Sequence, residues 1–176
     1  MLKDSIALIG FMATGKTTIG KALVEYLDND YKFIETDQLI VQQAGKSIPR
    51  IFDEEGEEEF RAYEISVCKQ VSELNKVVIS CGGGVILNHI NIQHLSKNCY
   101  IVLLTATSDE IFNRAIKDGK ETRPLIDKED PKKEIMKILK FRKPLYEKAA
   151  EIVIDTTDKT IENIVREIVI NTYLKT

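Results

Sequence analysis

The chain has 176 residues, which is enough for one domain with a sizeable hydrophobic core. Hydrophobic residues make up 43% of it and charged residues 30%, the ordinary balance of a soluble globular protein. With 25 basic and 28 acidic residues the net charge is −3, so nothing in it favours a nucleic acid or an anionic membrane as partner. No apolar run approaches the length of a membrane span, and we expect no membrane-embedded function.

The start of the chain and its cysteines both favour a cytoplasmic protein. Residues 1–4 lead straight into an apolar strand pattern, so we expect no signal peptide. The cysteines are odd in number and lack metal-type spacing, and we expect them to be reduced and semi-buried. They are Cys68, Cys81 and Cys99. His89 and His94 lie five residues apart on an expected helix, where surface positions are favoured over a metal pair.

The first expected strand, at 6–9, runs into a glycine-rich turn and then into a helical pattern that ends near residue 27. The turn, residues 10–17, reads Gly-Phe-Met-Ala-Thr-Gly-Lys-Thr, which is the P-loop pattern. In this arrangement the backbone amides of the turn and the positive end of the helix face a phosphate group. Lys16 can reach the outer phosphates and Thr17 can ligate Mg²⁺. The stretch therefore predicts a bound nucleoside triphosphate.

A short β-rich pattern at 31–34 follows and ends in Glu35, Thr36 and Asp37. Acidic residues at the carboxyl end of a strand in an open α/β sheet lie where ligands bind. A helical pattern then begins at Leu39, and we expect ligand contacts from the acidic residues in front of it.

An acidic run at 53–59 separates this region from a long amphipathic helix at 60–74. We interpret most of the run as a solvated junction between helices. Arg61 and Glu64 are three residues apart on the long helix, so they share a face and can pair.

A fully apolar strand at 77–81 is suited to the middle of a parallel sheet. It is followed by Gly82, Gly83 and Gly84. Three glycines at the end of a central strand indicate backbone that another group must approach closely. A plain flexible loop is the alternative, and the position of the run favours binding.

The rest of the chain continues the alternation of strands and helices. Strand patterns lie at 100–104 and 152–154, and helical patterns lie at 88–96, from 107, at 131–150 and at 161–169. Arg114 and Arg142 lie on two of these helices. The polar connection 118–131 carries Arg123, and a loop of this length is usually functional or disordered. Its functional version is a lid over the phosphates.

Five strand patterns alternating with helices predict a three-layer α/β/α fold with a parallel sheet and right-handed crossovers. Asp37 can accept a hydroxyl proton, and Arg61 and Arg142 suit a carboxylate because a guanidinium binds it with two parallel hydrogen bonds. A small hydroxylated carboxylic acid therefore fits as phosphoryl acceptor. The alternative is that both arginines are surface ion-pair partners of the acidic run.

Together these motifs resemble the shikimate kinase family, a group of nucleoside-monophosphate-kinase-like P-loop enzymes. The resemblance spans essentially the whole chain and is carried by the P-loop and by four further motifs. These are 35–37, the stretch from 45 to 64 with its Phe60-Arg61 pair, 82–84, and Arg123-Pro124-Leu125 with 142–146. The glycine run together with the Phe-Arg pair separates this family from gluconate and adenylate kinases, which share the P-loop.

The resemblance implies transfer of the γ-phosphoryl group of ATP to the 3-hydroxyl of shikimate, which gives 3-phosphoshikimate and ADP on the route to chorismate and the aromatic amino acids. It also implies strand order 2-3-1-4-5, one domain over 1–176, a substrate-binding region at about 37–63 and a lid at about 115–130. A monomer with Mg²⁺ as cofactor is the corresponding expectation.

By the family pattern, three residues are expected to be catalytic: Lys16, Asp37 and Arg123. Shikimate is expected to contact Asp37, Arg61, Gly82, Gly83, Gly84 and Arg142. ATP is expected to contact Ala13, Thr14, Gly15, Lys16, Thr17, Thr18, Arg114 and Arg123. The metal is expected on Thr17, with Glu35 acting through water.

Three positions depart from the family pattern. Glu35 stands where aspartate is common, and one extra methylene can shift the metal geometry. Ala13 replaces a common third glycine of the P-loop, which costs little unless that position needs a positive φ angle. Cys81 precedes the glycines at a position where the family varies.

Two other functions compete with this interpretation. One is a kinase for another small hydroxy acid, such as gluconate. The other is a binding module that keeps the pocket but has lost turnover and regulates a partner. Since Lys16, Asp37 and the arginines are all present, we rank the binding module lowest.

Overall fold

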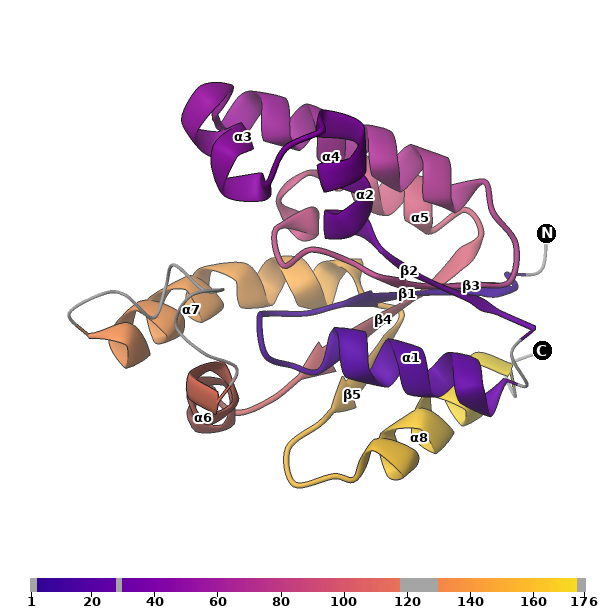
Figure 1. The fold of residues 1–176 in the computed structure, drawn as a ribbon. Coiled ribbons are helices and arrows are strands. Elements are labelled where there is room, and N and C mark those ends of the chain that lie inside the picture. Colours follow the sequence, from indigo (N-terminus) through magenta and orange to yellow (C-terminus); the bar gives the residue numbers. More distant parts are fainter. Residues whose placement is uncertain (1–2, 28–29, 118–129, 174–176) are drawn as a thin grey trace.

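A computed structural model describes residues 3–27, 30–117 and 130–173 (Figure 1). The strands are β1 (Ser5–Ile9), β2 (Lys32–Glu35), β3 (Val77–Ser80), β4 (Cys99–Thr105) and β5 (Ile152–Asp155). The helices are α1 (Lys16–Tyr26), α2 (Thr36–Ala44), α3 (Ile48–Glu54), α4 (Gly56–Ser72), the short 3-10 helix η1 (Val85–Leu87), α5 (His89–Leu95), α6 (Ser108–Lys117), α7 (Pro131–Ala149) and α8 (Ile161–Tyr173).

The described strands form one parallel sheet in the order β2-β3-β1-β4-β5, which confirms the expected order. The central strand β1 pairs with β3 on one side and with β4 on the other. Leu8 lies opposite Ser80 and Val102 in the two registers. The first strand of the chain therefore carries its P-loop to the middle of the sheet.

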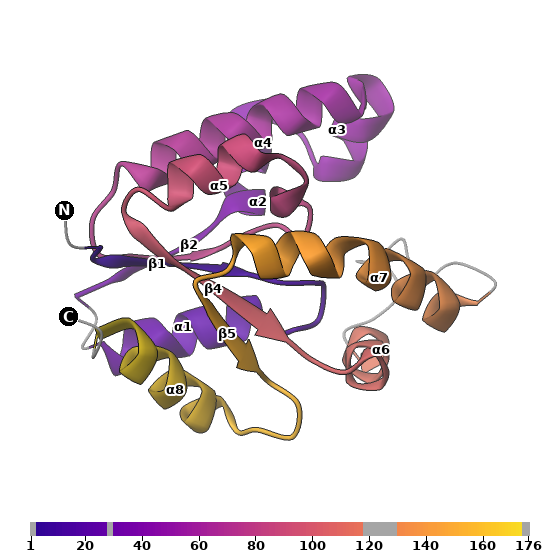
Figure 2. The same cartoon turned by 180° about the vertical axis from the view of Figure 1, so that it is seen from behind.

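Side chains alternate between the two faces of the sheet, and each face has its own hydrophobic core. On β1, Ala7 and Ile9 pack toward α2, α4, α5 and α7, while Ile6 and Leu8 pack toward α1 and α8. Figures 1 and 2 show these two sets of helices above and below the sheet. The three-layer α/β/α fold is thus confirmed.

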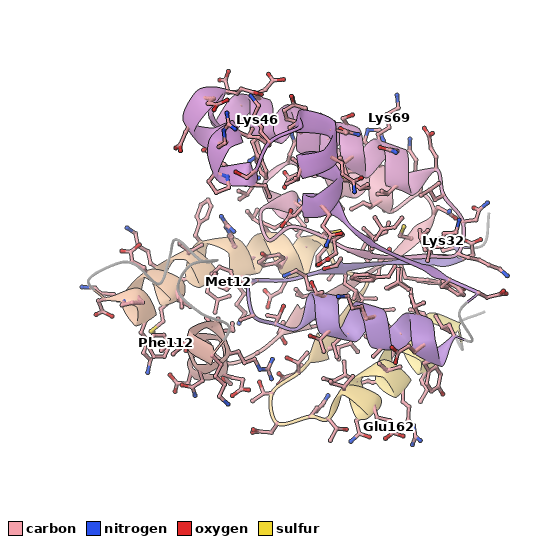
Figure 3. The ribbon with its side chains drawn as sticks, viewed as in Figure 1. Met12, Lys32, Lys46, Lys69, Phe112 and Glu162 are labelled. Atoms are coloured by element: carbon pink, nitrogen blue, oxygen red, sulfur yellow. The ribbon has the colours of Figure 1, made fainter. Side chains whose placement is uncertain are left out.

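All five strands point the same way, so their carboxyl ends share one edge of the sheet. Figure 3 labels Met12 in the loop that follows β1, and Lys32, which begins β2, at the opposite end of the sheet. Helices α6 and α7 extend beyond the edge at which Met12 lies (Figures 1 and 2). That edge is where ligands bind in open parallel sheets.

The structure differs from the sequence-based expectation at the start of α2. The helix begins at Thr36 instead of near Leu39, because the chain turns directly from β2 into helix. Asp37 therefore lies in the first helical turn, where the helix dipole favours a negative charge.

The other expectations on this part of the chain can also be compared with the structure. The three cysteines are free thiols and are buried, more deeply than expected. Among the described residues, no group of three or more metal-ligating side chains includes His89 or His94. No described helix is both long enough and apolar enough to span a bilayer.

Candidate active site

The P-loop is held by hydrogen bonds within its own few residues. Lys16 Nζ donates to the carbonyl oxygens of Gly10 and Phe11 at 2.8 Å each, and the buried Thr14 hydroxyl donates to the Phe11 carbonyl at 2.8 Å. The first helical residues of α1 have no intrahelical acceptor for their N–H groups, because that helix begins at Lys16. An ammonium group and the N–H groups of a helix N-terminus thus lie at one small turn, which is what a phosphate chain requires.

Ala13 adopts a left-handed backbone conformation, with φ at 59°. A side chain at such a position costs on the order of 1 kcal/mol relative to glycine. From the sequence, alanine at this position is expected to cost little unless φ is positive. Because φ is positive here, the replacement of glycine by alanine does cost conformational free energy. The Ala13 carbonyl still takes part in the site, since Arg114 Nη1 lies 3.5 Å from it.

Three side-chain oxygen groups lie close together beside the P-loop. The Thr17 hydroxyl donates to Glu35 Oε1 at 2.6 Å, and Ser80 Oγ lies 3.5 Å from Thr17 Oγ1. Glu35 and Ser80 are opposite each other in the β2–β3 register. Hydroxyl and carboxylate oxygens are the ligands that Mg²⁺ prefers, so this set fits the expected metal.

A cavity of about 570 Å³ opens at the carboxyl edge of the sheet. Its lining includes Ala13, Thr14, Gly15, Lys16, Thr17, Thr18, Glu35, Asp37, Gly82, Gly83 and Arg114. Residues expected to bind ATP and residues expected to bind shikimate therefore share one cavity. Arg61, Gly84 and Arg142 are outside this lining. Gly84 is the last residue of the glycine loop, residues 82–84, and Arg61 and Arg142 contact that loop.

Asp37 lines the cavity and is exposed to solvent, yet neighbouring protein atoms displace part of the water around its carboxyl. This partial desolvation raises the pKa of its carboxyl, the Lys16 ammonium opposes the rise, and Glu35 adds to it. A carboxylate with a raised pKa is a better proton acceptor, which suits a general base.

The glycine loop lies directly against the side chains of Asp37 and Arg61. A Cβ atom on Gly82 would lie 2.5 Å from Asp37 Oδ1, and one on Gly84 would lie 2.6 Å from Arg61 Nη1. The φ angles of these glycines are not in the left-handed region, so close approach, and not backbone conformation, is what requires glycine here. Gly82 N–H also donates to Thr36 Oγ1 at 2.9 Å, which ties the loop to the start of α2.

Arg61 lies between an exposed and a buried carboxylate. Its guanidinium is 3.1 Å from Glu57 Oε1 and 3.1 Å from Glu64 Oε2. The expected Arg61–Glu64 pair is confirmed, and the ion-pair alternative holds in part because Glu57 belongs to the acidic run. Glu64 is 1% exposed, and burial raises the pKa of its carboxyl while Arg61 opposes that rise.

Arg142 approaches the glycine loop from the opposite helix, α7. Its Nη1 donates to the Gly83 carbonyl at 3.1 Å, and the buried Tyr146 hydroxyl donates to the same carbonyl at 2.6 Å. Burial raises the pKa of Tyr146 to about 12, so its hydroxyl stays protonated as a donor. Two guanidinium groups thus flank one loop, an arrangement that can hold a carboxylate.

Comparison with known proteins decides the family. The family model described as shikimate kinase matches residues 12–172. A shikimate kinase of Caldanaerobacter subterraneus is 45% identical over 171 residues, covering 97% of this chain and 96% of that protein. The chain belongs to the shikimate kinase family. A Hahella chejuensis shikimate kinase is 40% identical over 95% of this chain and 85% of its own length.

Solved structures agree with this membership of the shikimate kinase family. The structure of shikimate kinase from Acinetobacter baumannii in complex with shikimate superposes with a TM-score of 0.89. It is 30% identical and covers 99% of this chain and 95% of that chain. The shikimate kinase from Aquifex aeolicus has a TM-score of 0.78 at 35% identity, with 94% of each chain covered.

Within this shikimate kinase family member, Arg114 of α6 links the P-loop to the segment after β5. It donates to Glu110 Oε1 in its own helix at 2.7 Å, to the Ala13 carbonyl at 3.5 Å, and to Thr156 Oγ1 and the Thr156 carbonyl at 3.0 Å each. The segment after β5 is therefore anchored beside the P-loop. Arg123 and most of the expected lid at 115–130 lie outside the described residues.

Two buried groups at the site have no counterpart in the sequence-based expectations for it. The Tyr146 hydroxyl holds Gly83, and the Asn91 amide contacts Glu64 and the Val85 carbonyl. Asn91 has a signal in the sequence, because it lies four residues before Leu95 and so shares that residue's buried helix face. Tyr146 lies within a motif already singled out, but nothing in the sequence indicates its partner.

Proposed function

We propose that this protein transfers the γ-phosphoryl group of ATP to the 3-hydroxyl of shikimate, producing 3-phosphoshikimate and ADP. Membership of the family supports the reaction. The single observation that carries the site assignment is the shared cavity, in which Lys16 of the P-loop and Asp37 of α2 line the same space as Gly82 and Gly83.

In this proposal each half of the site has a separate task. Arg61 and Arg142 bind the shikimate carboxylate on either side of the glycine loop and so fix the ring. Asp37 binds the reacting hydroxyl and takes its proton as the phosphoryl group transfers. Lys16 neutralises charge on the transferring group, and we assign Arg123 the same task.

The nucleotide side completes the proposal. Backbone amides from Ala13 to Thr18 hold the phosphates, and Arg114 borders the base. Thr17 would hold Mg²⁺, with Glu35 acting through water, and the ion would supply neutralisation of the phosphate charge. We further propose one domain over 1–176 that works as a cytoplasmic monomer, with a substrate-binding region at about 37–63 and a lid at about 115–130.

A coupled ADP-release assay tests the reaction directly. The purified protein is incubated with ATP, Mg²⁺ and one acceptor at a time from shikimate, gluconate and a nucleoside monophosphate. We expect ADP release that depends on shikimate and is at background level with the other acceptors. Turnover with gluconate and none with shikimate would replace the proposal with a different hydroxy-acid kinase. Shikimate binding by calorimetry without ADP release would instead favour a binding module.

A further inference from the structure

Asn91 is a polar residue on the buried face of a helix. It lies on α5 and is 0% exposed, and the next buried position of that helix is Leu95. An amide in such a place costs free energy unless its groups find partners. Asn91 pairs only one end of its amide, because Oδ1 is buried with no hydrogen-bond partner among the residues that the structure describes.

The hydrogen bonds of the Asn91 NH₂ group explain why an asparagine is present. Asn91 Nδ2 donates to Glu64 Oε2 at 3.2 Å and to the Val85 carbonyl oxygen at 3.1 Å. Both partners are acceptors, so the amide cannot turn round without placing Oδ1 against a carboxylate and a carbonyl. The NH₂ group is therefore the part in use.

The two partners of Asn91 belong to two different elements of the proposed acceptor site. Glu64 is on α4 and holds Arg61, while Val85 follows directly after the glycine loop. Arg61 in turn lies against Gly84, the residue before Val85. Contacts thus run in a closed circuit from Arg61 through Glu64 and Asn91 to Val85, and back through Gly84 to Arg61.

We propose that Asn91 is a positioning residue for the acceptor: its amide fixes the Glu64 carboxylate, and through it the Arg61 guanidinium, at a set place over the glycine loop. This inference rests on the proposed function, because Arg61 is taken to bind the acceptor carboxylate. Asn91 itself lies behind the site and touches neither substrate. Its loss leaves Glu64 with Arg61 alone and lets the guanidinium move relative to Gly84.

A purely structural role for Asn91 makes different predictions. If the amide only joined α5 to η1, its removal would lower the midpoint of thermal unfolding without a selective change in either KM. A positioning role raises KM for shikimate and leaves KM for ATP alone, since Lys16 and Thr14 are held by bonds within the P-loop.

The test uses Asn91→Leu, which keeps the approximate size and removes the donor. Thr172→Val is the matched control, because Thr172 is also 0% exposed and its hydroxyl hydrogen-bonds the Ile168 and Val169 carbonyls in α8, among the helices on the other face of the sheet. We expect Asn91→Leu to raise KM for shikimate about tenfold, the effect of losing roughly one hydrogen bond to a charged group, and to leave KM for ATP within about twofold. Thr172→Val leaves both values unchanged.

A double-mutant comparison isolates the route through Arg61. In an Arg61→Ala background, Asn91→Leu should add no further increase in KM for shikimate, because the residue that it positions is gone. An equal increase in both backgrounds, or an unchanged KM for shikimate in the single variant, would overturn the inference. If Asn91→Leu does not fold, Asn91→Ser replaces it. Serine is smaller, and its hydroxyl is too short to reach both Glu64 and the Val85 carbonyl. The same rise in KM for shikimate is expected, and an unchanged KM for shikimate would again overturn the inference.

Wild-type turnover in the same assay separates this inference from the proposed function. Wild-type protein that does not phosphorylate shikimate contradicts the proposed function. Wild-type protein that does so, with an Asn91→Leu variant of unchanged KM for shikimate, contradicts the role of Asn91 alone.

Discussion

The donor and acceptor halves of the cavity are built in opposite ways. The phosphate-binding part of the donor half is one stretch of chain, residues 10–18, whose geometry is set by bonds between near neighbours such as Lys16 and the Gly10 carbonyl. The acceptor half takes Asp37 from α2, Arg61 from α4 and Arg142 from α7, and brings them to the loop at 82–84. Its geometry depends on contacts between residues far apart in the sequence.

This difference predicts how each half responds to substitution. A local turn keeps its shape when a distant helix shifts, because its hydrogen bonds stay within a few residues. An assembly of helices does not, and Arg61 in particular depends on the buried carboxylate of Glu64. Changes behind the site should therefore affect KM for shikimate and spare KM for ATP.

The largest effect is expected where the two halves meet, at Asp37. Asp37→Asn keeps the shape and removes the base, so kcat should fall about 10²- to 10⁴-fold while ATP still binds. Steady-state kinetics measure kcat, and an ATP titration measures ATP binding. Asp30→Asn is the control, because Asp30 pairs with Lys76 on the exposed surface, just before β2 at the amino end of the sheet. Near-normal kcat in Asp37→Asn would show that Asp37 is not the general base.

A smaller effect is expected from Arg142→Lys, which keeps the charge and loses the planar guanidinium. KM for shikimate should rise about tenfold, since one charge-assisted hydrogen bond is worth roughly 1.5–3 kcal/mol and an ammonium retains part of it. KM for ATP should stay within about twofold. Arg166→Lys, at an exposed pair with Glu162 on α8, serves as control. An unchanged KM for shikimate would make Arg142 a structural residue only.

The smallest effect concerns the stability of the acceptor half. The pKa of Glu64 is raised in the folded protein, chiefly by burial, so the folded state holds this proton more tightly than the unfolded chain does. Stability therefore falls as pH rises through the raised pKa, and Glu64→Gln avoids that loss. Arg61 and Asn91 oppose the rise, while Asp37 adds to it.

Thermal unfolding at several pH values between about 4 and about 8 measures this effect. The unfolding midpoint of Glu64→Gln minus that of the wild type should increase with pH, by about 2–4 °C for roughly 1 kcal/mol. KM for shikimate in Glu64→Gln should rise, because Arg61 loses a charged partner. If the midpoint difference between Glu64→Gln and the wild type decreased with pH, the pKa of Glu64 would be lowered by folding instead of raised.

Much of the fold was predictable from sequence because its signals are local. The P-loop, the apolar strand expected at 77–81 and found at Val77–Ser80, and the strand order all agree with the expectations, the order through the family resemblance. The Arg61–Glu64 pair was also predictable, since helical spacing alone brings those side chains together.

The remaining features depend on contacts that no local pattern encodes. Packing between distant elements sets the start of α2 at Thr36. It also brings the Tyr146 hydroxyl to the Gly83 carbonyl, 63 residues away in the sequence. The positive φ of Ala13 is likewise a property of the folded turn. The three glycines were correctly expected to admit a close approach, but the structure alone shows that Asp37 and Arg61 are the groups that approach.

Gly84→Ala tests the division between the two halves most directly. The added methyl group would lie 2.6 Å from Arg61 Nη1, the end of a flexible side chain, so the fold can be kept while the guanidinium is displaced. The measurement is KM for shikimate and for ATP in this variant and in the wild type. We predict a rise of about tenfold for shikimate, the order of effect of one charge-assisted hydrogen bond, and no more than about twofold for ATP. An unchanged KM for shikimate, or an equal rise for both substrates, would contradict an acceptor half assembled independently around the glycine loop.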